Sequence, residues 1–253
     1  MLISPEPRGH FVQFTGADQR YLVRNVGRFL FEGLQAGDGL VSIATPERSV
    51  AFIAEIIRLG GDPESAIARG RLLVLDRDKT LESICIAGQP DAERFDAVVG
   101  GALRGLRGRK IRAYGEMVGK LWSEGRRAQA VYLEDLWNQL QRDLAFALFC
   151  SYTIDVFGPE FELASVDPVL CSHTDLLPSG LDRALVRAVN SAMEEVLGDR
   201  VQSLRELITA NYRPAWGSLP APESIILWLR NNLPDLADAI VARAREHYNA
   251  LTE

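Results

Sequence analysis

The sequence predicts an α/β protein with a mostly parallel sheet covered by helices on both faces, plus an all-α C-terminal appendage. Short apolar segments alternate with amphipathic ones through the first two thirds of the 253 residues. This alternation is typical of a parallel sheet, because parallel strands need long crossover connections that are usually helical. After about residue 158, prolines interrupt the chain and helical periodicity follows. That change marks the appendage.

Five segments have the composition of strands, and they cover residues 10–14, 40–44, 72–76, 111–114 and 145–152. Helices are predicted between them, where apolar residues recur every three or four positions, near residues 18–34, 46–59, 95–103, 117–124 and 128–141. The second helix has a clear start, since Thr45 offers a capping hydroxyl and Pro46 suits the first turn. The side chains predicted to point inward from it are those of Val50, Ile53, Ile56 and Ile57.

The chain is expected to divide near residue 178. Residues 1–178 would form the sheet domain and residues 179–253 a helical C-terminal region, with helices over 181–196, 201–210, 225–229 and 236–251. One further strand is predicted around residues 169–171. On such a strand Cys171 and His173 would share one face, which leaves a catalytic pair or half of a metal site open as an alternative.

Composition argues against several classes of protein. The net charge of -6 disfavours a general nucleic-acid binder, which needs a concentrated basic surface. Cys85, Cys150 and Cys171 form no CxxC pair, and no group of ligand-type residues has metal-site spacing, so we expect neither a metal nor a cofactor. No signal peptide is recognisable at the start, and no apolar run has the length of a membrane span. The cytoplasm is therefore the expected location.

Several short phrases follow one another in a characteristic order, namely His10-Phe-Val-Gln-Phe14, Phe29-Leu-Phe-Glu-Gly-Leu34, Ile43-Ala-Thr-Pro46, Tyr114-Gly-Glu-Met-Val118 and Leu136-Trp-Asn138. Their joint order from residue 10 to about residue 173 resembles the MEDS family, named for methanogen and methylotroph proteins and a dichloromethane-response regulator. The resemblance implies a sensory module with a RecA/KaiC-like fold. It also implies an association with a histidine kinase or a transcription regulator.

The segment where a RecA-like protein would hold phosphate is altered in this chain. A working phosphate loop is rich in glycine and ends in Gly-Lys-Ser/Thr, so that backbone N–H groups and the lysine bind the phosphates. Residues 15–20 contain one glycine, no lysine and an aspartate, Asp18, which would repel phosphate. A KaiC-like fourth strand would end in an aspartate for magnesium, whereas this one ends at Tyr114-Gly-Glu116. We expect a non-catalytic sensor with a degenerate P-loop; the alternative is a nucleotide-binding ATPase with an atypical phosphate site.

Ligand-binding residues are predicted near the carboxyl ends of the strands, where ligands bind in open α/β sheets. Tyr114 and Glu116 would present an aromatic ring and an acid together. Alternatively, Tyr114 belongs to the core and Glu116 caps the helix that follows. Glu134 and Asn138 share one helix face, where they would either border a pocket or tie the helix to a loop.

Two tryptophans complete the predicted site, which consists of Tyr114, Glu116, Trp122, Glu134, Trp137 and Asn138. Trp122 and Trp137 would line an apolar pocket, although large aromatics on helix faces also serve as core. The expected partner is a small-molecule ligand or a regulatory protein such as a histidine kinase or a transcription regulator. Direct binding of nucleic acid or membrane is not expected, and homo-oligomerisation is left open.

Overall fold

The structure is a computed structural model that describes residues 9–16, 19–106, 108–177, 182–211 and 221–252. Contacts within the chain divide it into two compact units. Unit 1 consists of Met1–Thr153 together with Ser172–Thr174, and unit 2 consists of Ile154–Cys171 together with Asp175–Glu253.

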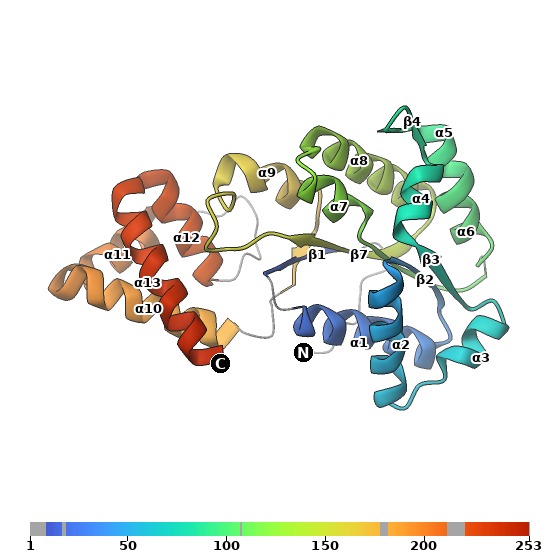
Figure 1. The fold of residues 1–253 in the computed structure, drawn as a ribbon, viewed down its shortest axis with the longest axis horizontal. Coiled ribbons are helices and arrows are strands. Elements are labelled where there is room, and N and C mark those ends of the chain that lie inside the picture. The colour runs from blue at the N-terminus through green and yellow to red at the C-terminus, as the bar shows by residue number, and fades with distance from the viewer. Residues whose placement is uncertain (1–8, 17–18, 107, 178–181, 212–220, 253) are drawn as a thin grey trace. The chain divides into compact units, whose positions relative to one another are not determined.

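Five parallel strands form the centre of unit 1, in the order β3-β2-β6-β7-β1. Figure 1 labels four of them, β1, β2, β3 and β7. Their bounds are β1 (His10–Thr15), β2 (Gly39–Ala44), β3 (Leu72–Asp76), β6 (Ile111–Gly115) and β7 (Phe146–Thr153). In the register of these strands, Tyr114 of β6 stands between Ser42 of β2 and Phe149 of β7. The pairings between these strands are parallel, so the predicted sheet and its five predicted strands are confirmed.

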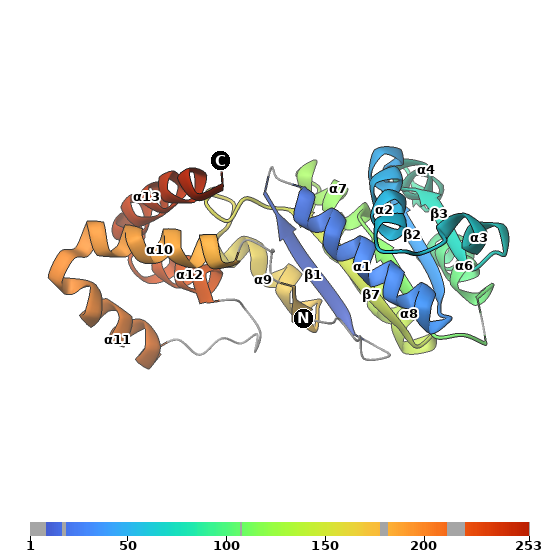
Figure 2. The same cartoon turned by 90° about the horizontal axis from the view of Figure 1, so that it is seen from below.

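Helices cover both faces of the sheet of unit 1. On one face lie α1 (Arg20–Ala36) and α2 (Pro46–Arg58), which Figure 2 shows in front of the strands when this unit is seen from below. On the other face lie α7 (Met117–Ser123) and α8 (Arg127–Asp143) (Figure 1). The remaining elements of the unit are α3 (Pro63–Ala68), α4 (Arg77–Ser83), the antiparallel pair β4 (Cys85–Ile86) and β5 (Gln89–Pro90), α5 (Ala92–Phe95), the π-helical turn Asp96–Gly100 and α6 (Gly101–Arg104).

The start of α2 agrees with its sequence, but its buried face does not. The Thr45 hydroxyl accepts a hydrogen bond from the backbone N–H of Arg48 at 3.2 Å, and Pro46 lies in the first turn. Val50 and Ile57, which were predicted to point inward, are 68% and 52% exposed, so that part of the prediction is wrong. They lie seven residues apart and share one helix face, whereas the helix packs through the opposite face, which carries buried Phe52 and Ile56.

Unit 2 is built mainly from helices. Their bounds are α9 (Leu163–Cys171), α10 (Asp182–Leu197), the 3-10 turn Gly198–Arg200, α11 (Val201–Asn211), α12 (Ala221–Asn232) and α13 (Pro234–Thr252), and the short strand β8 (Asp175–Leu176) also belongs to this unit. The predicted C-terminal helices are confirmed. The most extensive helix pairing joins α10 to α13. Across the described part of the chain, no helix combines the length and apolar character that a membrane span requires.

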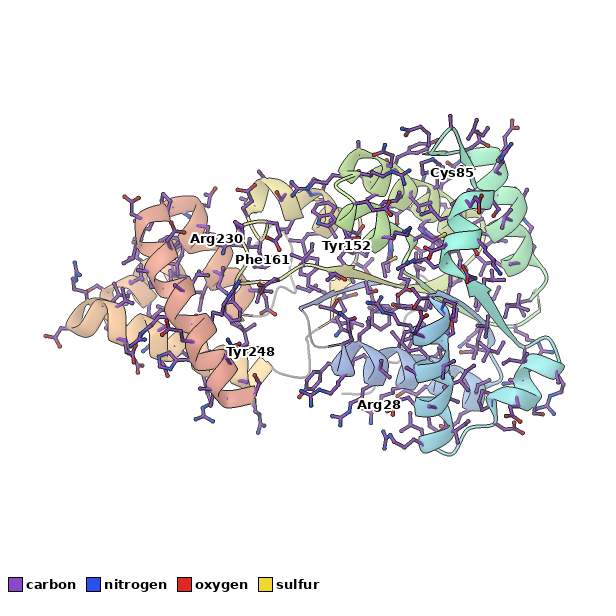
Figure 3. The ribbon with its side chains drawn as sticks, in the orientation of Figure 1. Arg28, Cys85, Tyr152, Phe161, Arg230 and Tyr248 are labelled. Atoms are coloured by element: carbon purple, nitrogen blue, oxygen red, sulfur yellow. The ribbon has the colours of Figure 1, made fainter. Side chains whose placement is uncertain are left out.

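Residues 169–171 were predicted as a strand, and this prediction is wrong because they form the end of α9. The helix packs against α12, and it buries Val169 and Leu170. Nearby, the Arg230 guanidinium of α12 donates to the carbonyl oxygens of Phe157, Gly158 and Phe161 (Figure 3). These contacts place residues 154–171 with the C-terminal helices, so the compact units divide the chain differently from the predicted boundary at residue 178.

Candidate functional site

The six predicted site residues lie in two groups on opposite faces of the sheet of unit 1. Tyr114 stands beside Phe149 in register, with ring centroids 5.7 Å apart, and the two rings meet Phe52 of α2 and Phe29 of α1, so they lie on the face covered by these helices. Glu134 of α8 instead contacts Cys150 and Tyr152, which alternate with Phe149 along β7 and therefore point to the other face. The structure does not bring Tyr114 and Glu134 into one pocket.

The first group is centred on the carboxylate of Glu116, which is 1% exposed. Its Oε1 accepts a hydrogen bond from the backbone N–H of Thr45 at 2.6 Å, and its Oε2 accepts from the Arg48 guanidinium. The Tyr114 hydroxyl donates to Oε2 at 3.2 Å, and Arg77 Nη1 lies 3.8 Å from Oε1. We call these five residues the strand-end network. Its carboxylate is satisfied on both oxygens by groups of the protein itself.

The strand-end network lies where the order of the strands reverses. From β2 the chain passes outward to β3 and then returns to β6 on the other side of β2. In open α/β sheets, ligands bind beyond the carboxyl ends of the strands at this switch point. Here the Glu116 carboxylate already occupies the positive end of α2, a position that suits a phosphate in other proteins. Glu116 is also the N-cap residue of α7, as the alternative interpretation expected, although its side chain makes no capping hydrogen bond there.

Two protonation states in the strand-end network are set by burial and by Glu116. Burial and the Glu116 carboxylate both raise the pKa of Tyr114 well above its usual value, so the phenol stays neutral. Its hydroxyl also lies 2.8 Å from the Ser151 hydroxyl. Burial acts to lower the pKa of Arg48, but Glu116 outweighs burial and the pKa is raised. Arg48 is therefore a fixed cation whose second terminal nitrogen donates to Gln19 Oε1 at 2.8 Å.

The second group contains four side chains of metal-ligating type, His10, Glu134, Cys150 and His173, which we call the histidine cluster. Their ligand atoms all lie within 4.8 Å of one another. His10 Nε2 is 3.4 Å from both Cys150 Sγ and Glu134 Oε2, and His173 Nε2 is 3.3 Å from Glu134 Oε1. The side chains of both histidines and of Glu134 are at most 2% exposed.

Four separate segments bring the histidine cluster together. His10 opens β1, Cys150 lies in the middle of β7, and Glu134 lies on α8. His173 lies on the segment Ser172–Thr174, which runs beside β1. The backbone N–H of Thr174 donates to the His10 carbonyl at 2.7 Å, and the His10 N–H donates to the Thr174 hydroxyl at 2.9 Å. This pairing sets the two imidazole rings 4.0 Å apart, centroid to centroid.

A second layer of polar groups orients the histidine cluster. Asn138 Oδ1 lies 3.0 Å from His10 Nδ1, and Asn138 Nδ2 donates to the Ser172 carbonyl at 3.1 Å. Asn138 therefore ties α8 to the segment that carries His173. This is the second of the two roles considered for it, that of a tie between the helix and a loop. Tyr152, labelled on β7 in Figure 3, donates its hydroxyl to Glu134 Oε1 at 2.6 Å.

Burial controls the protonation of the histidine cluster. Burial and the neighbouring His173 lower the pKa of His10 to about 3, so its imidazole is neutral near pH 7. For Glu134, burial acts to raise the pKa, but the two histidines and the Tyr152 hydroxyl outweigh burial and lower it. Burial and the Glu134 carboxylate raise the pKa of the Cys150 thiol well above its usual value. The contact between His10 and Glu134 is thus a contact of a neutral ring with a carboxylate, not an ion pair.

The two predicted tryptophans have different surroundings. Trp137 is fully buried with Phe95 and Phe146 around it, at ring distances of 5.1 and 6.1 Å, and it fills core space. Trp122 packs edge-on against Tyr152 at 5.6 Å and so borders the residue that holds Glu134. A ligand-binding role for the six predicted residues remains a prediction.

His10, Cys150 and His173 were not predicted as site residues. From the sequence, His173 was considered as a metal ligand or catalytic residue, but as a partner of Cys171 on the predicted strand. Cys171 is exposed and its sulfur lies 3.7 Å from an Asp167 carboxylate oxygen, outside the histidine cluster. Asp18, which carried part of the argument against phosphate binding, lies outside the described residues.

The family model of the MEthanogen/methylotroph, DcmR Sensory domain (MEDS) matches residues 9–174 of this chain. The matched range includes every member of the strand-end network and of the histidine cluster. A search of curated proteins finds no match.

Proposed function

Since the chain belongs to the MEDS family of sensory domains, we propose that it is a non-catalytic module that binds a small molecule or a protein partner and signals through another polypeptide. The observation that carries the non-catalytic part is the position of Glu116. Its carboxylate takes the backbone N–H at the start of α2 and the guanidinium of Arg48. A triphosphate would need those groups free, and it would meet a buried negative charge in their place.

The ligand site that we propose is the strand-end network. It lies at the switch point of the sheet, and it combines the neutral Tyr114 hydroxyl with the Ser151 hydroxyl 2.8 Å away. These groups suit a small neutral molecule with hydrogen-bonding capacity. Glu116 is paired with Arg48, and Arg77 is paired with Asp78, so these charges give no net attraction for an anion.

Unit 2 is the proposed output element. It contains a groove of about 700 Å³ whose lining includes Phe157, Leu163 and Val241 with charged residues around them, among them Arg245 and Glu246. A groove lined by both apolar and charged side chains suits a segment of another protein. A histidine kinase or a transcription regulator is the class of partner that we propose, and we assign any self-association of the chain to the same unit.

Nucleotide binding separates the sensor from the ATPase alternative. In isothermal titration of the full chain with Mg-ATP, and in a phosphate-release assay, we expect neither binding nor turnover above background. Magnesium-dependent binding accompanied by turnover that is lost in Arg48→Ala would overturn the proposal. The ligand is sought separately by a thermal-shift screen of small neutral compounds. A true ligand should lose its shift in Tyr114→Phe and keep it in Tyr132→Phe, whose side chain is exposed on α8.

A further inference from the structure

We propose that the histidine cluster is a binding site for one divalent transition-metal ion, and that zinc is the ion its ligand set fits first. The cluster offers two imidazole nitrogens, one cysteine sulfur and one carboxylate oxygen. These are the donor types that zinc takes in proteins, usually four at a time in a tetrahedron. The proposal concerns binding alone and does not depend on the sensory function.

The donor atoms of His10, Cys150 and Glu134 have spacings close to those of a tetrahedral site, and His173 lies within reach of them. Zinc–ligand distances of about 2.0–2.3 Å place neighbouring ligand atoms about 3.3–3.6 Å apart. His10 Nε2 lies 3.4 Å from Cys150 Sγ and 3.4 Å from Glu134 Oε2, and the ligand atoms of all four residues, His173 included, lie within 4.8 Å of one another. Cys150 Sγ and Glu134 Oε2 are slightly farther apart, at 3.9 Å. Small side-chain rotations would bring all four donors onto one ion.

The surrounding hydrogen bonds aim the donors at a common point. Asn138 Oδ1 faces His10 Nδ1, so the proton of this ring belongs on Nδ1 and the lone pair on Nε2 points to the cluster. Tyr152 donates to Glu134 Oε1, which leaves Oε2, the oxygen next to His10 and Cys150, as the one that we assign to the metal. Metal sites commonly use such outer partners to fix ligand orientation.

Charge balance gives an independent argument. Glu134 is fully buried, and the nitrogens that lie near its carboxylate among the described residues belong to two imidazole rings, not to a lysine or an arginine. A buried carboxylate is costly unless a cation accompanies it. A divalent ion bound by the Glu134 carboxylate, the Cys150 thiolate and two neutral imidazoles would form a site with no net charge. The metal would also deprotonate the thiol, as zinc does in other cysteine sites.

Metal binding would also hold a connection in the chain. Three of the ligands lie on β1, β7 and α8, whereas His173 lies on Ser172–Thr174, between the two stretches that make up unit 2. A metal ion would therefore fasten this connecting segment to the sheet of unit 1. If the chain is a sensor, as proposed above, metal binding can affect unit 2 directly, because residues 172–174 are covalently joined to unit 2 at both ends.

The test uses the full chain after treatment with a chelator. We expect Zn²⁺ to bind with one-to-one stoichiometry in isothermal titration. We expect Co²⁺ to produce the strong visible bands of a four-coordinate site, with a near-ultraviolet thiolate charge-transfer band. Cys150→Ser should abolish the charge-transfer band. Loss of a residue that only orients a ligand typically weakens metal binding by about 10- to 100-fold, so loss of the proposed ligand in His173→Gln should weaken Zn²⁺ binding by at least about 100-fold. Asn138→Ala should weaken it by about 10- to 100-fold.

Matched controls lie elsewhere in the chain. Cys85→Ser and His247→Gln change residues outside the histidine cluster and should leave both the stoichiometry and the Co²⁺ spectrum unchanged. His173 lies outside the helices and strands, so we expect the His173→Gln variant to fold. It therefore tests the site even if the Cys150→Ser variant, which changes a residue in the middle of β7, does not fold. The absence of Zn²⁺ binding to the wild-type chain would overturn the proposal, as would binding that His173→Gln leaves intact. Either result would leave the proposed sensory function untouched, because no sensory response is measured.

Discussion

The strand-end network and the histidine cluster are both built around a buried glutamate, yet they balance its charge in different ways. Glu116 has the Arg48 guanidinium, the nearby Arg77 and the start of α2. Glu134, on the opposite face of the same sheet, has two imidazoles, a thiol and a phenol. One carboxylate is thus neutralised by fixed cations of the protein, whereas the other has no lysine or arginine beside it among the described residues. The comparison shows why the charge of Glu116 needs no added cation, whereas the charge of Glu134 can accept one.

The largest effect that we expect from this comparison concerns stability. In the presence of a chelator, Glu116→Gln should lower the free energy of unfolding by about 3 kcal/mol, because it leaves Arg48 without its partner in a partly buried position. Glu134→Gln should cost less, since it removes a buried charge that has no fixed cation. Urea denaturation of the two variants measures the difference. Equal losses would mean that the two carboxylates are balanced alike.

The strands and most helices could be predicted because their signal is local. Apolar runs such as 72–76 and the helical spacing in 128–141 depend on neighbouring residues, and the structure confirms both elements. The face of α2 was harder to predict, because Val50 and Ile57 are as apolar as buried Ile56 and only packing distinguishes them. The hydrogen-bond partners of the Glu116 carboxylate could likewise not be predicted, since Thr45 and Arg48 lie about seventy residues earlier in the sequence.

The histidine cluster had no local signal at all. Its members come from β1, α8, β7 and a short segment after α9, so no spacing in the sequence reveals it. The prediction of a strand at residues 169–171 then placed His173 beside Cys171 instead of His10. The hydrogen bonds of Thr174 with His10, together with those of Asn138 to His10 and to the Ser172 carbonyl, bring the two histidines together. Prediction of such a site requires the sheet order and the path of the chain after α9.

An effect of intermediate size is expected at low pH, where the histidine cluster should lose stability. The pKa of His10 is lowered to about 3 in the folded chain from an unfolded value of 6.5, so the unfolded state binds the proton more readily between these values. Its contribution to stability is fully present above about pH 6.5 and is lost as the pH falls toward 3. The lowered pKa of Glu134 acts in the same direction at the acidic end.

We therefore expect the free energy of unfolding, measured in urea with a chelator present, to fall by up to about 1.4 kcal/mol per pH unit below pH 6. His10→Gln should flatten this slope, and His247→Gln, in unit 2, should leave it unchanged. Zn²⁺ affinity should fall over the same range. A slope that persists in His10→Gln would place the acid sensitivity outside the histidine cluster.

The smallest effect tests whether the two glutamates depend on their tyrosines in the same way. Tyr114 donates to Glu116 at 3.2 Å and Tyr152 donates to Glu134 at 2.6 Å, so Tyr→Phe removes one hydrogen bond from each carboxylate. Each change should cost about 1 kcal/mol of unfolding free energy without metal. The two variants should differ in Zn²⁺ titration, because only Tyr152 orients a proposed metal ligand. Tyr152→Phe should weaken Zn²⁺ binding by about tenfold, whereas Tyr114→Phe should match the wild type. If both variants bound Zn²⁺ like the wild type, Oε2 of Glu134 would not depend on the Tyr152 hydrogen bond for its orientation.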